Sequence, residues 1–307
     1  MQDQKKRNGM TKQWSMRLLL SCVCLLGNDC SNATQDYKLR ENDPKKTKKN
    51  SLPSKDWNHE FTIALEQAHY NYREPDVYQH PIYNTYGARW VQTVGNFWGG
   101  YASYCLTWQD TLFVQPEIRI LYGKHQYTRG QKGNILNKTK HAIPSLLYEP
   151  RLIVGGKLPS IYKVAVSPYT GLGYRFKSDD SEEVKTSRGH NLAFYRKSNY
   201  IYVPFGASAD YSVNETWSLT VKGEYDWIVK AWQYSRMPTE RATTFKQPNG
   251  YGLKGEATVS YLYQKVKFFV TPYVYYWNMR NSREKNEGAM EPYNITWETG
   301  LRLGVTF

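Results

Sequence analysis

The C-terminal segment of the chain reads Asn294-Ile295-Thr296-Trp297-Glu298-Thr299-Gly300-Leu301-Arg302-Leu303-Gly304-Val305-Thr306-Phe307. Apolar side chains recur on one face of it, at Ile295, Trp297, Leu301, Leu303, Val305 and Phe307. The opposite face carries Thr296, Glu298, Gly300, Arg302, Gly304 and Thr306. This alternation has the period of two that a β-strand with one apolar face requires. The segment therefore predicts a strand that runs to the final phenylalanine.

The same period recurs along most of the preceding chain, and it predicts an all-β protein. The expected strands cover residues 59–72, 97–108, 112–127, 145–157, 161–177, 195–211, 216–234, 249–263, 266–281 and 293–307. Two of them are irregular. The alternation of 59–72 slips near Gln67, and 266–281 has apolar and aromatic residues on both faces.

The connections between these strands alternate between short and long. Short turns are expected near residues 109–111, 158–160, 213–215 and 264–265, and long polar connections at 73–96, 128–144, 178–194, 235–248 and 282–292. Transmembrane barrels have short turns on the periplasmic side and longer loops outside. An even number of strands then leaves both ends of the strand-forming region on the periplasmic side.

Strand length and the placement of aromatic residues indicate which solvent the apolar face meets. The predicted strands exceed the roughly 5 or 6 residues that are usual in sheets, and they reach the about 9 to 11 residues that cross a bilayer. Tyr and Trp lie near strand ends, as in the aromatic girdles of membrane barrels. The pattern therefore predicts an antiparallel up-and-down transmembrane β-barrel of about ten strands over residues 58–307.

Charged residues on the face opposite the apolar one are expected to point into the barrel lumen. The acids are Glu117, Glu149, Glu224, Asp226, Glu256 and Glu298, and the bases are Arg119, Arg151, Arg175, Lys222, Lys254 and Arg302. Equal numbers of both signs favour a paired network, with an ion-lining filter as the alternative. Side chains just fill a barrel of about eight strands, whereas open channels need about 16. A mostly filled lumen is therefore expected, and a narrow porin-like channel is the alternative.

The N-terminus has the features of an export signal. Basic residues precede the apolar stretch LLLSCVCLL, and Ser31-Asn32-Ala33 fits a cleavage site, so residues 1–33 are predicted to be a signal peptide. Translation starting at Met10 or Met16 is compatible with the same signal. Leu19-Leu20-Ser21-Cys22 resembles a lipobox and leaves a lipoprotein signal as an alternative.

Residues 34–57 form a second zone that is polar and without periodicity. They carry the basic run 45–49 and predict a disordered periplasmic linker. A solvated tether is the simpler interpretation of these lysines, and binding of lipopolysaccharide phosphates is the functional one. Beyond residue 33 the sequence contains a single cysteine, Cys105, so no intramolecular disulfide is expected.

The terminal segment Leu301-Arg302-Leu303-Gly304-Val305-Thr306-Phe307 resembles the C-terminal signature of Gram-negative outer-membrane β-barrel proteins. Two internal segments, 167–175 (SPYTGLGYR) and 198–206 (SNYIYVPFG), are similar to those of a proteobacterial outer-membrane protein family without an assigned activity. The resemblance implies location in the cell outer membrane and insertion by the barrel-assembly machinery. The implied assembly signal consists of Leu301, Leu303, Val305 and Phe307. The high basicity and the long N-terminal region depart from the family pattern.

The net charge of +14 and the pI of about 9.4 favour contact with anionic surfaces. A basic patch in the connection 128–144 consists of Arg129, Lys132, Lys138 and Lys140. The simpler interpretation is that these charges keep an exposed loop soluble and held by lipid headgroups, and the functional one is that they attract lipopolysaccharide phosphates or anionic host glycans. Nucleic-acid binding is not expected, because the chain is predicted to be exported. The expected function is that of a filled barrel that acts through its surface loops, in adhesion, ligand or lipopolysaccharide binding, or envelope integrity.

Enzymatic activity is not expected from the residue pattern. An omptin-like surface protease is the alternative, since such barrels carry Asp and His at the outer rim. The rim candidates here form no compact pair, and they are His69, Glu74, Asp76, His80, Asp179, Asp180 and His190. A lipase-like barrel needs a Ser/His set, and His125 and His141 are predicted to be isolated. Metal-ligand spacing is absent, and neither a metal nor a cofactor is expected.

Overall fold

The structure is a computed structural model that describes most of the chain after residue 56. The described residues are 57–75, 77, 89–131, 134–139, 141–182, 184–185, 187, 189, 194–236, 242–283 and 290–307. The predicted signal peptide and the predicted linker up to residue 56 lie outside them. So do five single candidates named above, Asp76, His80, Lys132, Lys140 and His190.

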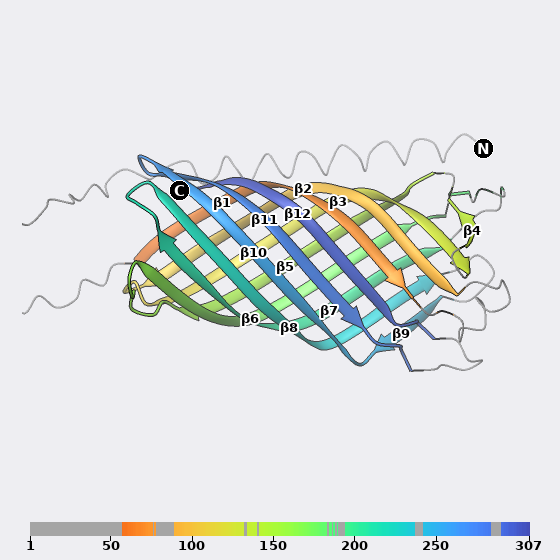
Figure 1. Cartoon of the computed structure of the whole chain (residues 1–307). Helices are drawn as coiled ribbons and strands as arrows, with labels where there is room; N and C mark the ends of the chain where they lie inside the picture. The colour runs from red at the N-terminus through yellow and green to blue at the C-terminus, as the bar shows by residue number, and fades with distance from the viewer. Residues whose placement is uncertain are drawn as a thin grey trace, which may run out of the picture. The chain divides into compact units, whose positions relative to one another are not determined.

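Antiparallel strands make up the described part of the chain (Figure 1). They are β1 (Trp57–Glu74), β2 (Trp90–Trp108), β3 (Leu112–Gln131), β4 (Asn134–Lys138), β5 (Ile143–Gly156), β6 (Val164–Asp180), β7 (Tyr195–Ser212), β8 (Trp217–Arg236), β9 (Thr243–Gln247), β10 (Gly250–Tyr263), β11 (Val266–Met279) and β12 (Asn294–Thr306). Across the described residues, no helix is both long and apolar enough to cross a bilayer.

Ten of these strands close into a barrel. Their order is β1-β2-β3-β5-β6-β7-β8-β10-β11-β12, and β12 pairs with β1 to complete the circle. At this seam the amide of Phe61 donates to the carbonyl of Phe307 at 3.2 Å, and the amide of Phe307 donates to the carbonyl of Phe61 at 2.9 Å. The predicted fold, an antiparallel up-and-down barrel, is therefore confirmed.

The short strands β4 and β9 extend one end of the barrel, where they pair with β3 and β8 (Figure 1). We call this the extracellular end, after the orientation that the loop lengths predict. The opposite end, with Phe307 and the short turns, is called the periplasmic end. The turn Gln264-Lys265 between β10 and β11 is one of these, and its tight path puts Gln264 at a φ of 55°.

Several connections at the extracellular end are shorter than predicted, whereas the one between β11 and β12 is slightly longer. β2 begins at Trp90, inside the predicted connection 73–96, and β3 continues to Gln131. β4 occupies part of the predicted connection 128–144 and pairs back onto β3. The predicted boundaries were wrong here because a polar hairpin that projects beyond the lipid has no apolar face, so its sequence resembles that of a loop.

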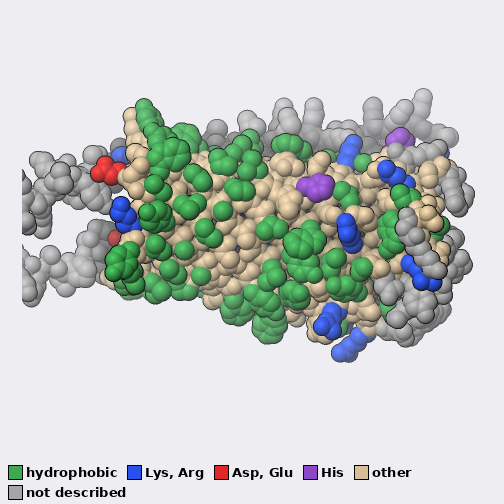
Figure 2. Space-filling view, viewed as in Figure 1, with side chains coloured by type: hydrophobic (Ala, Val, Ile, Leu, Met, Phe, Trp, Pro, Cys, Tyr) green, Lys and Arg blue, Asp and Glu red, His purple; other side chains and the backbone are tan. Residues whose placement is uncertain are grey.

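The outer wall is apolar over most of its height and carries aromatic rows (Figure 2). Outward side chains remain exposed, with Leu65 at 76% and Trp98 at 67%. A row of rings at the periplasmic end includes Trp57, Trp108, Trp217 and Tyr261. A second row crosses β8, β10, β11 and β12 through Tyr225, Tyr251, Tyr276 and Trp297, with successive ring centroids 6.0, 6.1 and 4.7 Å apart. Two such rows around an apolar band are the girdle arrangement of membrane barrels.

The two faces of β1 exchange polarity partway along the strand. Leu65 points outward, but the next outward position is Gln67, while the inward side chains Tyr70 and Tyr72 are buried. Inside and outside still alternate without a break. The strand register does not slip near Gln67. The apparent slip arises because, beyond Leu65, the outward side chains are polar and the inward side chains are aromatic. The ambiguous facing of the predicted strand 266–281 has the same origin, since its buried residues include Tyr273, Tyr275 and Trp277.

Candidate functional site in the barrel lumen

Ion pairs between neighbouring strands line one side of the lumen. β3 and β5 are in a register that puts Glu117 opposite Arg151 and Arg119 opposite Glu149. The Nε atom of Arg151 lies 2.7 Å from Oε1 of Glu117, and Nη1 of Arg119 lies 3.4 Å from Oε2 of Glu149. Because every second residue of a strand points to the same face, both pairs lie on the inner wall.

Arg119 joins this wall to the strands of the closing seam. Its Nε donates to Oε1 of Glu66 in β1 at 2.6 Å, and its Nη1 donates to Oε2 of Glu298 in β12 at 2.8 Å. Its Nη2 donates to the hydroxyl of Tyr273 in β11 at 3.0 Å. The Arg119 side chain is only 5% exposed, so these contacts are made away from bulk water. One guanidinium group therefore ties together side chains from β1, β3, β11 and β12.

Arg175 and Lys254 link walls that face each other across the lumen. Arg175 in β6 lies 3.1 Å from Glu149 and also pairs with Glu298 in β12, on the opposite side of the strand order. Lys254 in β10 lies 3.0 Å from Glu149 in β5 and 3.1 Å from Glu224 in β8. These two cations form crossbars through the lumen.

The structure brings all the predicted lumen residues except Lys222 into one continuous set of ion pairs. With Glu66 added, we call this set the waist network, and it consists of Glu66, Glu117, Arg119, Glu149, Arg151, Arg175, Glu224, Asp226, Lys254, Glu256, Glu298 and Arg302. Lys222 has no carboxylate within ion-pair distance among the described residues, and its ammonium lies 5.0 Å from the ring centre of Tyr169.

The sequence analysis missed Glu66, which pairs with Arg302 at 3.1 Å as well as with Arg119. The signal was present in the sequence. Phe61 and Leu65 belong to the outer face, and continuing that period places Glu66 inside. The apparent slip at Gln67 hid it.

Aromatic clusters fill the lumen beyond the waist network, toward the extracellular end. One cluster contains Ala68, Tyr70, Tyr72, Phe97, Leu121, Leu147, Tyr273 and Tyr275. A second contains Tyr200, Tyr202, Ile228, Ala231, Trp277 and Met279. The rings also contact the network, since the guanidinium of Arg175 lies 4.9 Å from the ring centre of Trp277, a cation–π contact. The lumen is thus occupied at two successive levels.

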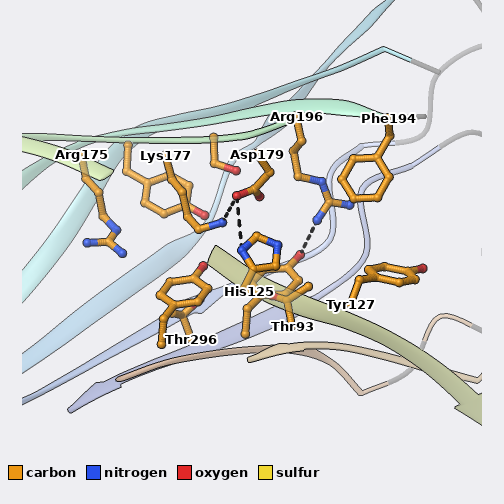
Figure 3. Close-up of a pocket in the computed structure, with 13 residues that line it drawn as sticks. Thr93, His125, Tyr127, Arg175, Lys177, Asp179, Phe194, Arg196 and Thr296 are labelled. Carbon is orange, nitrogen blue, oxygen red and sulfur yellow. Dashed lines mark hydrogen bonds and ion pairs between the residues drawn. The ribbon is translucent and has the colours of Figure 1, made fainter. Parts of the chain in front are cut away.

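A small cavity lies beside these clusters in the extracellular half of the barrel (Figure 3). Its volume is about 20 Å³, which is room for about one water molecule. Arg175, Lys177 and Arg196 reach it from β6 and β7, and His125 reaches it from β3 (Figure 3). Lys177 pairs with Asp179 and lies 4.7 Å from the ring centre of Tyr70. A cavity of this size does not pass a hydrated solute.

His125 was predicted to be isolated, and that prediction was wrong. Register places Ser145 of β5 opposite Asp179 of β6, with His125 on the adjoining strand. The Ser145 hydroxyl donates to Oδ1 of Asp179 at 2.6 Å, and its oxygen lies 2.9 Å from Nδ1 of His125. In a serine hydrolase the imidazole stands between serine and acid, so that it can take the serine proton. Here the serine stands between the other two, and the His125 side chain is 0% exposed.

Two buried carboxylates share one arginine at the extracellular mouth, and we call Glu74, Arg196 and Glu291 the mouth latch. Arg196 lies 3.3 Å from Glu74 and 3.7 Å from Glu291. Glu291 lies in the connection between β11 and β12, where its backbone amide donates to the hydroxyl of Ser282 at 2.7 Å. Burial raises the pKa of Glu291 to about 7, with Arg196 opposing the rise and Glu74 adding to it.

The mouth latch predicts a stability that depends on pH. Native Glu291 keeps its proton up to a pKa of about 7, whereas an unfolded glutamate has its ordinary value of 4.5. The native state binds more protons between these values, so stability falls as the pH rises from about 4.5 to about 7. We expect a loss on the order of 1–3 kcal/mol, measured as the denaturation midpoint in detergent at about pH 5 and about pH 8. Glu291→Gln should flatten this profile, and an unchanged slope in that variant would contradict the assignment.

The predicted basic patch of the connection 128–144 is not one surface in the part that the structure describes. β3 and β4 pair Thr128 with Lys138 and Arg129 with Asn137 on successive rungs, so the two basic side chains point to opposite faces. Lys138 is exposed, whereas Arg129 is half-buried. The extended hairpin imposes strand alternation on residues that were expected to lie together in a loop.

The four rim candidates of a protease that the structure describes also lie apart from one another. His69 points outward and pairs with Asn96 at 3.0 Å, Glu74 belongs to the mouth latch, and Asp179 is buried beside the cavity. Asp180 is exposed at the end of β6. Within the described ranges, no group of three His, Cys, Asp or Glu side chains is placed to hold a metal ion.

Comparison with known proteins places this barrel among outer-membrane folds. No protein-family model matches the sequence, and no curated protein matches it. Among solved structures, the outer membrane protease OmpT from Escherichia coli is similar at a TM-score of 0.53 and 10% identity, covering 84% of this chain and 99% of that one. The outer membrane protein OprG from Pseudomonas aeruginosa gives a TM-score of 0.31 at 9% identity, covering 80% and 94%.

The chain therefore has the fold of a Gram-negative outer-membrane β-barrel, and its predicted location in the outer membrane agrees with that fold. At such low identity the similarity concerns the fold alone. Function therefore has to be argued from the lumen and the surface of this chain.

Proposed function

We propose that the chain is a sealed outer-membrane barrel that acts through its extracellular end and conducts no solutes. The waist network is the observation that carries this proposal. Its charges are paired across the lumen, and its crossbars run between strands that are far apart in the barrel order, such as β6 and β12. A solute would have to break several buried ion pairs to pass, and stranding one buried charge costs about 3–5 kcal/mol.

A narrow channel is the main alternative. Selective pores present rings of like charge, or carbonyl oxygens, to the passing ion. In the waist network each cation instead contacts at least two carboxylates, as Arg151 does with Glu117 and Glu224 at 2.7 Å each. The aromatic clusters fill the lumen on the extracellular side of the waist network. The paired charges and the aromatic clusters both support a closed lumen.

An omptin-like protease has the support of fold similarity alone. Its expected Asp and His groups at the rim do not converge in the described residues, and the Ser145, His125 and Asp179 contact is buried in an order that does not activate the serine. A binding or structural role is therefore the better supported one.

The extracellular end is the proposed working surface. The strands extend beyond the apolar band there, and the mouth latch holds the connection between β11 and β12 against β7 through Arg196 and Glu291. Rigid strand ends are a suitable platform for exposed connections that bind partners. The partners we propose are lipopolysaccharide and outer-membrane lipid, a surface or host ligand, and the barrel-assembly machinery during insertion.

Solute uptake by proteoliposomes tests the sealed lumen. The folded protein, verified by its gel shift on boiling, should give the same osmotic swelling as protein-free liposomes with small sugars and amino acids. The double variant Arg175→Ala with Glu298→Ala removes one crossbar without stranding a charge. Liposomes that contain this variant should swell faster than those with the unaltered protein. Rapid swelling with the unaltered protein would overturn the proposal.

A further inference from the structure

The outer wall of β1, β2 and β3 changes from apolar to polar within two rungs near the extracellular end. Trp98 and Tyr122 are partners in the register and point outward, with exposures of 67% and 56%. One rung farther out, Asn96 is the partner of Lys124 on the same outer face. His69 of β1 continues this polar rung and pairs with Asn96 at 3.0 Å. Such a step from rings to polar groups marks the depth at which lipid headgroups begin.

The outer wall is hollowed at this step. A shallow, open groove of about 600 Å³ has side chains of Val94, Asn96, Trp98, Tyr122, Lys124, Gln126 and Ala142 along it, and we call it the headgroup groove. The β2 and β3 backbone at Gly95 and Gly123 also lines it. Both glycines are inward positions, since Gly95 pairs with the buried His125 and Gly123 with the buried Phe97, so the groove depends on the outward side chains.

The charge on this part of the wall has one sign. Outward positions of β1, β2, β3 and β5 near the extracellular end carry the bases Arg73 and Lys124 and, among the described residues, no Asp or Glu. The Lys124 ammonium forms no ion pair with any described residue and is exposed. Figure 2 shows Lys and Arg side chains gathered on the wall toward the end that carries β4 and β9. The groove therefore offers an unneutralised cation beside amide donors and aromatic rings.

We infer that the headgroup groove binds the phosphorylated sugar headgroup of a glycolipid in the outer leaflet. Lys124 contacts the phosphate, because an ammonium group forms charge-assisted hydrogen bonds with phosphate oxygens. The amides of Asn96 and Gln126 bind sugar hydroxyls, and the rings of Trp98 and Tyr122 pack against the apolar sugar face and the start of the acyl chains. This inference rests on the proposed partnership with outer-membrane lipid and names its site, which is on the outside of the barrel and does not depend on whether the lumen is sealed.

The geometry favours a lipid headgroup over a free anion. The groove is open along the wall, with its aromatic side toward the apolar band and its basic side toward the extracellular end. An occupant that matches both sides is amphipathic, with its phosphate toward the extracellular end and its hydrocarbon toward the apolar band. A free phosphate ion would use Lys124 alone and would leave the rings without a role.

Lipid retention measured by native mass spectrometry tests this inference. The probes are diphosphorylated lipid A, the same lipid after removal of its phosphates, and inorganic phosphate, each offered to the full barrel in detergent micelles. Lys124→Gln should weaken binding of the phosphorylated lipid about tenfold, and Lys124→Arg should largely retain it. The matched control is Lys265→Gln, which removes the same charge from an exposed turn at the periplasmic end and should bind as the unaltered protein does. Trp98→Ala should weaken binding of both lipid forms.

Three results would overturn the inference. The first is equal retention by the unaltered protein and Lys124→Gln. The second is equal binding of the phosphorylated and phosphate-free lipids, which would make the groove a general acyl-chain site. The third is displacement of the lipid by inorganic phosphate at millimolar concentration, which would make Lys124 a simple anion site. Because Lys124 is exposed, its replacement leaves the fold intact, and the gel shift on boiling verifies this.

Discussion

Arg119→Ala should lower the free energy of unfolding by about 3–5 kcal/mol, because it removes the cation that three buried carboxylates share. Glu66 and Glu298 lie 2.6 and 2.8 Å from the guanidinium, and their side chains are 0% and 1% exposed. Glu66 would keep Arg302, and Glu298 would keep Arg175, but neither acid would be fully compensated. The measurement is the denaturant midpoint of the folded barrel in detergent micelles.

Two comparisons separate this effect from general damage to the lumen. Lys222→Ala removes an inward base that pairs with no described carboxylate, and it should cost much less than Arg119→Ala. Adding Glu298→Gln to Arg119→Ala should recover part of the loss, because it removes one of the carboxylates that lost a cation. Equal costs for Arg119→Ala and Lys222→Ala would show that the ion pairs do not stabilise the barrel.

Phe307→Asp should leave most of the chain in the periplasm instead of the outer membrane. Phe307 lies at the seam, where its backbone pairs with Phe61, and its side chain is 55% exposed on the outer face. A charge near the membrane interface costs the folded barrel only about 0–1 kcal/mol. A large loss of assembly would therefore reflect failed recognition of the terminal strand. Cell fractionation and surface labelling give the measurement.

Phe61→Asp is the matched control for that change. Phe61 is the seam partner of Phe307 and is also outward, at 38% exposure, but it lies in β1 rather than at the chain end. It should reduce assembly far less. Both purified variants should still refold into detergent. Normal membrane levels of Phe307→Asp, or an equal loss in both variants, would show that the terminal residue is no assembly signal.

The sequence was sufficient for the barrel and for the inward or outward direction of most charges, because both follow from a period of two. Glu117 and Arg119 could be assigned to the lumen from their alternation with apolar neighbours. Their facing partners Arg151 and Glu149 could be predicted in the same way. Contacts across the lumen, such as Arg175 with Glu298, could not be predicted from alternation, because they depend on the tilt and stagger of the closed sheet.

The extracellular half was harder to predict for a physical reason. Once a strand leaves the lipid, its outer face becomes polar, while its inner face can be aromatic, as at Tyr70 and Tyr72. The rule that apolar side chains point outward then reverses, and the strand resembles a loop or an irregular segment. This reversal hid Glu66, shortened the predicted β2 and β3, and made His125 look isolated although Ser145 and Asp179 lie beside it.

Single-channel recording in planar lipid bilayers tests the sealed lumen most directly. The unaltered barrel, inserted from detergent and verified as folded, should show conductance near that of the protein-free bilayer in both polarities. The double variant Arg175→Ala with Glu298→Ala should produce measurable conductance steps, and these steps would show that the barrel inserts into the bilayer. Steady and well-resolved channels from the unaltered protein would contradict a lumen closed by the waist network.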